Sequence, residues 1–220
     1  MASALDMALQ PITSILGHAH TGIGCPRIAN RRQFLGLATT IAVAPALLLP
    51  RKSFASTARP DEIDAGFWLS ARSVRLVRPN TSQRIELTYW RDGAYLDDAY
   101  SELCFFLLDR RERLAVQMAP AVFDLTFATQ RWFELATGKR ATTTITDAYR
   151  TNRTNVLVGG AELSAHKVGA ALDGLLDNVT LPTYAAMLLR FSAGGVGLYP
   201  RHVHWDVGRN PVFWRSSQAE

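Results

Sequence analysis

Three histidines close to the C-terminus have the residue type and the spacing of a metal site. Of the five histidines in the chain, only His166, His202 and His204 follow residue 55, and they stand in two short strings. The first string is SAHKVGAALD at 164–173 and the second is HVHWDVG at 202–208. Imidazole and carboxylate are the usual protein ligands of zinc, and a catalytic zinc takes three of them plus an open position. The two strings therefore predict a metal centre that does chemistry.

The second string alternates as a half-buried strand does. Successive side chains of a strand point to opposite faces, so His202, His204 and Asp206 share one side. The other side carries apolar residues that suit a core, namely Val203, Trp205 and Val207. Taken alone, this string is equally compatible with a polar surface strand that carries two incidental histidines.

The first string places His166 seven residues before Asp173. The glycine and alanines between them allow a loop histidine and a strand carboxylate to converge while the backbone stays close to a neighbour. The string also fits the pattern SxHxxGxAxD, and through it the chain resembles the zinc D-Ala-D-Ala carboxypeptidases and murein endopeptidases, the LAS-type metallopeptidases. The matching residues are Ser164, His166, Gly169, Ala171 and Asp173.

Within that family the chain looks most like the YcbK-like murein endopeptidases, which use twin-arginine export. A Tyr-Arg-Thr turn typical of them is found at 149–151, followed by Asn155, although Ala148 replaces the usual glycine before the tyrosine. A glycine-rich GGVGLY segment at 194–199 then leads into the last strand, as it does in that group. The resemblance covers roughly 70–214.

The resemblance implies that His166, Asp173 and His204 bind Zn²⁺ and that Arg150 and Ser164 contact the substrate. It also implies an α+β fold of the hedgehog and D-Ala-D-Ala-peptidase type. In that fold, helices flank a small antiparallel sheet and the zinc site lies on the central sheet. The expected reaction is hydrolysis of amide bonds in peptidoglycan stem peptides or cross-links, by an endopeptidase or a carboxypeptidase, with a water activated by the metal.

The identity of the general base stays open. Some family members place a glutamate three residues before the last ligand, where this chain has Arg201. Others use a histidine two residues before it, which favours His202. Asp206 is the second candidate, and it can instead orient an imidazole as a hydrogen-bond partner of the ligand.

Two other functions remain compatible with the same residues. The chain can be a catalytically weak or inactive peptidoglycan-binding module that keeps a structural metal, because the usual glutamate is absent. It can also be a periplasmic metal-binding protein. This function is less favoured, because three protein ligands leave an open coordination position that suits a reaction.

The N-terminal segment predicts export. Arg31 and Arg32 stand directly before the apolar run 34–49, and small residues surround a cleavage point after Ala55. The run is shorter than the roughly 20 residues of a membrane span and contains Pro45. Residues 1–55 are therefore interpreted as a twin-arginine signal peptide, 56–66 as a tether and 67–220 as the zinc peptidase domain. We expect a periplasmic protein without a stable membrane span after cleavage; an uncleaved N-terminal anchor is the alternative.

Charge argues against one class of binding partner, and the cysteine content argues against an internal disulfide. Residues 1–55 contain five of the 24 Lys and Arg and one of the 19 Asp and Glu, so the remainder has 19 basic and 18 acidic residues. A nearly neutral domain has no excess positive charge for phosphates, which argues against a nucleic-acid partner. The resemblance implies peptidoglycan as the partner. Cys25 lies in the leader, so Cys104 has no partner for a disulfide inside the mature domain.

Hydrophobic periodicity predicts one α+β domain. A hairpin is expected at 73–78 and 84–90, and a helix from 97 whose solvated end is 110–113. Further helices are expected at 120–137, around 151–157, and from 181 to about 191. Further strands are expected at 142–145, 169–175, 196–199, 202–207 and 212–215.

Overall fold

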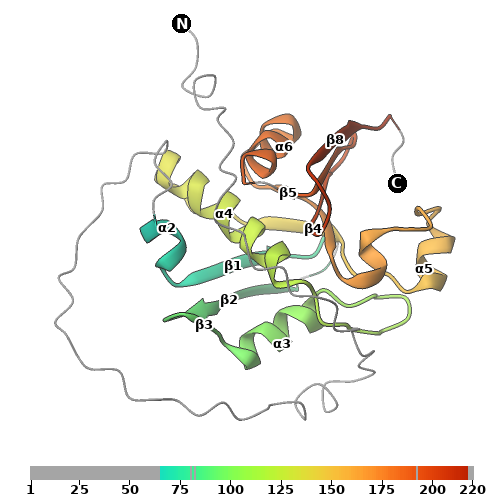
Figure 1. Ribbon diagram of the computed structural model, residues 1–220, viewed down its shortest axis with the longest axis horizontal. Helices are drawn as coiled ribbons and strands as arrows, with labels where there is room; N and C mark the ends of the chain where they lie inside the picture. The colour runs from blue at the N-terminus through green and yellow to red at the C-terminus, as the bar shows by residue number, and fades with distance from the viewer. Residues whose placement is uncertain (1–64, 80, 82, 192, 218–220) are drawn as a thin grey trace, which may run out of the picture.

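In the part of the chain that the structure describes, eight strands form one curled sheet that crosses the domain (Figure 1). The structure, a computed structural model, describes residues 65–79, 81, 83–191 and 193–217. The strand order is β3-β2-β1-β4-β5-β7-β6-β8. The strands are β1 (Arg72–Val77), β2 (Arg84–Arg91), β3 (Ala94–Tyr95), β4 (Thr143–Asp147), β5 (Ala171–Leu176), β6 (Gly195–Leu198), β7 (Val203–Asp206) and β8 (Val212–Arg215).

The expected α+β class is confirmed, but the sheet is larger than expected and mixed rather than antiparallel throughout. Strand β1 pairs with β4 in parallel, and β6 pairs with β8 in parallel. The remaining neighbours are antiparallel, including the β1–β2 hairpin that the sequence predicts. Parallel neighbours require a long crossover, and the chain between β1 and β4 contains two helices that provide one.

Three longer helices pack on the sheet, and their ends follow local sequence signals (Figure 1). They are α3 (Asp97–Phe106), α4 (Pro120–Thr137) and α6 (Leu181–Arg190); shorter elements are α2 (Ala65–Leu69), α5 (Asn152–Leu157) and the 3₁₀ turn η2 (Ala165–Val168). Helix α4 starts with proline and ends at Gly138, whose φ of 70° suits glycine. Thr151 and Thr180 accept a backbone N–H at the first turns of α5 and α6.

The expected helical end at 110–113 is wrong. Helix α3 ends at Phe106, and the arginine-rich segment forms a turn closed by a bridge between Asp109 and Leu114. The buried Asp109 carboxylate accepts the backbone N–H groups of Arg111 at 2.9 Å and of Glu112 at 3.2 Å. A short acidic side chain that bonds the backbone in this way stabilises a turn in competition with a helix.

One face of the central strands is core and the other carries the site. Trp205 of β7 is fully buried and contacts Tyr184 of α6, with ring centroids 5.5 Å apart. Because strand side chains alternate, His204 and Asp206 point to the opposite face. The expected leader, and the tether up to residue 64, lie outside the described residues. Within the described part, no helix is both long and apolar enough to cross a membrane.

Candidate metal centre

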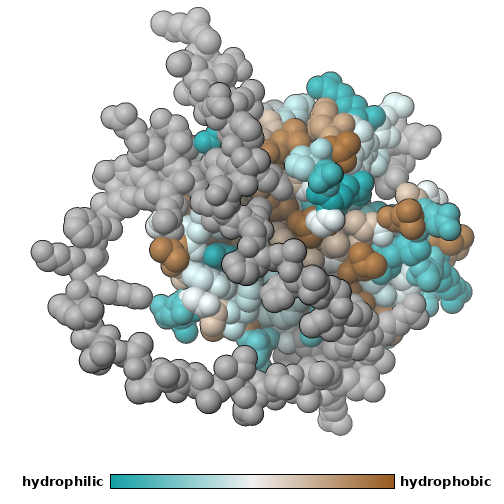
Figure 2. Space-filling view, viewed as in Figure 1, coloured by the Kyte–Doolittle hydropathy of each residue, from teal (hydrophilic) through white to brown (hydrophobic). Residues whose placement is uncertain are grey.

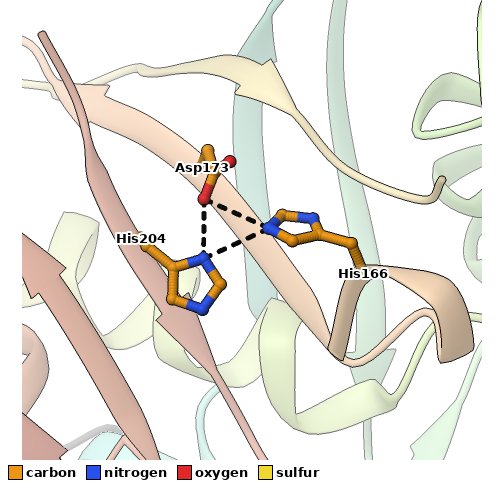
Figure 3. Close-up of side chains that lie close together, drawn as sticks. All are labelled: His166, Asp173 and His204. Carbon is orange, nitrogen blue, oxygen red and sulfur yellow. Dashed lines mark hydrogen bonds and ion pairs between the residues drawn. The ribbon is translucent and has the colours of Figure 1, made fainter. Parts of the chain in front are cut away.

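Two histidines and one aspartate converge on a single point (Figure 3). His166 comes from η2, Asp173 from β5 and His204 from β7. Asp173 Oδ1 lies 2.7 Å from His204 Nδ1 and 3.2 Å from His166 Nε2, and the two nitrogens are 3.1 Å apart. In the described part of the chain, this is the only group of three or more His, Cys, Asp or Glu residues that could hold a metal ion.

Strand register brings the two sheet residues together. Asp173 of β5 and His204 of β7 are direct partners across the antiparallel pair. The row continues on both sides: Asp147 of β4 lies opposite Asp173, and Gly197 of β6 lies between His204 and Trp214 of β8. Direct cross-strand partners have Cβ atoms about 5 Å apart, so this row delivers its side chains to one place on the sheet.

The tautomer of His166 follows from its second ring nitrogen. Nδ1 lies 2.6 Å from the carbonyl oxygen of Ala148, and a carbonyl can only accept a hydrogen bond. The Nδ1–H group therefore donates to Ala148, which leaves Nε2 to face Asp173. Residue 148 belongs to the segment just after β4, so the tertiary structure sets which nitrogen is available.

Asp206 fixes the tautomer of His204, as the Ala148 carbonyl fixes that of His166, by contacting the ring nitrogen that faces away from Asp173. Its Oδ2 lies 3.2 Å from His204 Nε2, and its Oδ1 accepts the Gly195 N–H at 2.7 Å and the Arg209 Nε–H at 2.9 Å. Burial alone raises the pKa of the Asp206 carboxyl, but the hydrogen bonds from His204, Gly195 and Arg209 outweigh it and lower the pKa. An ionised carboxylate only accepts, so His204 Nε2 carries its proton and Nδ1 faces Asp173.

The cluster needs a positive charge at its centre. Three lone pairs within 3.2 Å of one another repel unless a proton or a cation lies between them. Burial lowers the pKa of His204, but hydrogen bonds to Asp173 and Asp206 outweigh it and raise the pKa to about 9. For Asp173, burial raises the pKa, and the attraction of His166 and His204 brings it well below the ordinary value. A divalent cation can replace that proton, so these residues fit a metal ion.

Arg150 holds the other oxygen of Asp173. Its side chain is only 4% exposed, and it donates from Nη2 to Asp173 Oδ2 at 3.1 Å and from Nε to Asp147 Oδ2 at 2.8 Å. Arg150 therefore fixes the carboxylate so that Oδ1 faces the histidines. The family resemblance implies a substrate contact for Arg150, and the structure places it beside the cluster.

Aromatic rings form one wall of the site. The Trp214 ring lies 5.3 Å from the His204 ring, and its Nε1–H donates to the Tyr199 hydroxyl at 3.2 Å. Glycine is required beneath the indole, since a Cβ on Gly197 would come within 2.7 Å of it. His202, just before β7, is buried and stacks on Tyr199 with ring centroids 4.6 Å apart.

The rim on the His166 side is partly apolar. Ser164 lies two residues before His166 and is half-buried. Nearby, Leu163 is 93% exposed, and Val156 and Leu157 of α5 are also exposed. Figure 2 shows apolar and hydrophilic residues intermixed over α5, at the right of the view. This rim provides surface that a substrate can contact.

Three residues that hold the cluster in place belong to none of the motifs recognised in the sequence, namely Asp147, Arg209 and Trp214. Arg209 follows Asp206 by three residues, a spacing that suggests an ion pair but is common by chance. Asp147 and Trp214 carry no local signal, because only the strand register brings them to the row.

Comparison with known proteins identifies the family. Residues 68–213 match the family described as peptidoglycan L,D-endopeptidase MepK. The chain belongs to this family. Peptidoglycan L,D-endopeptidase MepK of Escherichia coli strain K12 is 28% identical over 187 residues, which cover 82% of this chain and 94% of the relative. The proteins of the same name from Escherichia coli O157:H7 and Shigella flexneri give the same values. The matched MepK region contains every residue of the cluster and its polar partners.

Proposed function

We propose that this peptidoglycan peptidase holds one zinc ion through His166 Nε2, His204 Nδ1 and Asp173 Oδ1. Ligand atoms about 2 Å from a tetrahedral zinc ion lie roughly 3.3 Å from one another. The three distances here are 2.7, 3.1 and 3.2 Å, which a small adjustment brings to that value. Two imidazoles and one carboxylate suit zinc better than magnesium or calcium, which prefer oxygen ligands.

Zinc in such a site supplies a Lewis acid for the scissile carbonyl and lowers the pKa of the attacking water. The chain's own residues supply the rest. Asp206 keeps the proton on His204 Nε2, so the imidazole presents Nδ1. We assign the general base to His202, which precedes His204 by two residues and is held against Tyr199. Asp206 is fully buried and already accepts three hydrogen bonds, which favours orientation over proton transfer.

We propose that the bond cut is an L,D amide bond in the peptide part of peptidoglycan, as the names of the relatives indicate for them. Arg150 places a buried positive charge beside the metal ligands. Gly160 packs closely against this side chain, since a Cβ there would lie 2.3 Å from Asn155 Oδ1 and 2.9 Å from Arg150 Nη1. A substrate carboxylate can bind such a guanidinium, with Ser164 on the adjoining rim.

The proposed cellular setting follows from the substrate. Peptidoglycan lies outside the cytoplasmic membrane, so the peptidase must be exported. We assign this role to residues 1–55 as a cleaved twin-arginine signal, with 56–66 as a tether and 67–220 as a hedgehog and D-Ala-D-Ala-peptidase-like domain. The mature protein is then a periplasmic enzyme.

The convergence of three lone pairs on one point carries the proposal, and muropeptide analysis tests it. Purified mature protein should release new fragments from peptidoglycan, detected by mass spectrometry. A chelator should abolish release and added Zn²⁺ should restore it. His166→Ala should lose both zinc and turnover, whereas His202→Asn should keep zinc and lose turnover.

Two results would contradict the proposal. Undiminished cleavage by fully chelated protein would exclude the metal mechanism. Binding of peptidoglycan without fragments at any zinc loading would favour an inactive binding module instead.

A further inference from the structure

The arginine-rich turn at 110–113, where a helix end was expected, borders a surface hollow. The hollow measures about 370 Å³ and lies between the β1–β2 connection and the end of α3. Phe105, Phe106 and Leu108 contribute apolar surface, and Arg110 and Arg113 contribute cationic side chains. An adjoining hollow of about 350 Å³ shares Phe105 and Phe106 and adds Arg84 and Glu102. We call the first of these the arginine hollow.

The positive charge of the arginine hollow has no partner within the described residues. Arg110, Arg111 and Arg113 are exposed, and none of them has a carboxylate within ion-pair distance in the described chain. The domain around them is nearly neutral, with 19 basic and 18 acidic residues after residue 55. The turn is therefore a local concentration of cations beside an apolar floor, and a ligand with carboxylates and aliphatic parts complements both.

The same turn is fastened to the segment that carries Arg150. Asp109, which closes the turn, also accepts the backbone N–H of Thr151 at 2.9 Å. Glu112 lies 3.5 Å from Arg153 of α5, which gives a second link. Figure 1 shows the loop after α3 running below α5. The arginine hollow and the metal centre are thus on connected segments, so one long polymer can reach both.

We propose that the arginine hollow is a second peptidoglycan-binding site that takes a carboxylate-bearing stem peptide away from the bond being cut. The inference rests on the proposed function, because it takes its ligand from the same polymer. Guanidinium groups bind carboxylates with two parallel hydrogen bonds, and peptidoglycan repeats its carboxylates along the strand. A second attachment point raises the effective concentration of the polymer at the metal centre without changing the chemistry there.

Charge reversal tests the proposal on intact, zinc-loaded mature protein. Arg110→Glu combined with Arg113→Glu is compared with a matched control, Arg91→Glu combined with Lys139→Glu. Both control residues are exposed, and Arg91 lies at the opposite end of β2 from Arg84. Binding to purified sacculi is measured by co-sedimentation in a His202→Asn background that does not digest them. Turnover of a small soluble cross-linked muropeptide is measured in the His202-containing protein.

We expect the Arg110 and Arg113 double variant to bind sacculi about tenfold more weakly at low ionic strength, with the difference shrinking in 1 M salt. The control should bind normally. Sacculi whose carboxylates have been converted to amides should bind both proteins equally. Turnover of the small muropeptide should stay within twofold, since that substrate is too short to need the second site.

Several outcomes would overturn the proposal. Unchanged binding to sacculi at low salt would do so, as would binding to anionic lipid vesicles in place of sacculi. Equal losses on sacculi and on the small muropeptide would assign the turn to the metal centre instead. If the reversed variant unfolds, Arg110→Gln with Arg113→Gly decides, because glycine suits the φ of 54° at position 113. Absence of turnover in every protein would defeat the proposed function, while the sacculus binding would still decide the second site.

Discussion

Replacing Asp206 by asparagine separates ligand orientation from proton transfer. The substitution keeps the size of the side chain and removes its charge. Asp206 is fully buried and bonds His204, Gly195 and Arg209. If Asp206 orients His204, the variant should bind zinc more weakly. If Asp206 is instead the general base, zinc affinity should be preserved and only turnover should fall.

The size of the effect follows from the hydrogen bond to His204 Nε2. A bond to a charged acceptor contributes about 1.5–3 kcal/mol and a neutral one about 0.5–1.5 kcal/mol. The loss is then about 1–2 kcal/mol in the zinc-bound state, or roughly 5–30-fold in affinity. At neutral pH a second effect opposes this loss. Without Asp206 the pKa of His204 falls from about 9, so a proton competes less with zinc.

The decisive assay is therefore zinc competition against a calibrated chelator at pH 10 and at pH 7. At pH 10 His204 is neutral in both proteins, so the full loss of affinity should appear, whereas at pH 7 the loss should be smaller. Asp124→Asn is the matched control, because Asp124 is also a buried carboxylate, bonded to Tyr89 and Arg72. It should lower stability without changing zinc affinity. An Asp206→Asn protein whose affinity at pH 10 is within twofold of the parent would refute the reasoning.

Three further predictions concern the metal cluster and the residues packed around it. The pKa of His204 is raised from 6.5 to about 9 in the folded protein, so without bound metal its charged ring stabilises the fold fully below pH 6.5. This stabilisation is lost as the pH rises through 9. Urea unfolding should show a decrease of up to about 3 kcal/mol in the free energy of unfolding, which a His204→Gln variant lacks. Gly197→Ala should displace the Trp214 indole, lower stability by about 1–3 kcal/mol, shift tryptophan fluorescence and reduce muropeptide turnover. Arg150→Met should lower the free energy of unfolding by about 3 kcal/mol, because Asp173 loses its buried partner, with part of the loss restored in Arg150→Lys.

Local patterns predicted most of the elements correctly. The bounds expected for α4 match the structure, because proline at the first turn and glycine after the last are signals carried by the residues themselves. The alternation around His204 likewise predicted a strand, which the structure gives as Val203–Asp206, with Trp205 in the core and His204 in the cluster. At 110–113 the same reasoning failed. The charged residues suit a helix end, but the buried Asp109 bonds the backbone of that segment and turns the chain.

Residue types and spacing pointed to a metal centre within the two histidine strings, and the family resemblance then implied His166, Asp173 and His204 as its ligands. The sequence left open whether Asp206 is a base or an orienting partner. Its role depends on the contacts that the folded chain gives it, and three hydrogen bonds now favour orientation.

The amino-acid order alone indicated most of the longer helices and strands and two histidine strings that can bind a metal, since both depend on residues close together along the chain. Tertiary structure decided the pairing of β1 with β4, the row from Asp147 to Trp214, and the ring nitrogens that His166 and His204 present. These features arise from contacts between segments far apart in the sequence. No local period encodes them, because register and hydrogen-bond partners exist only once the strands have met.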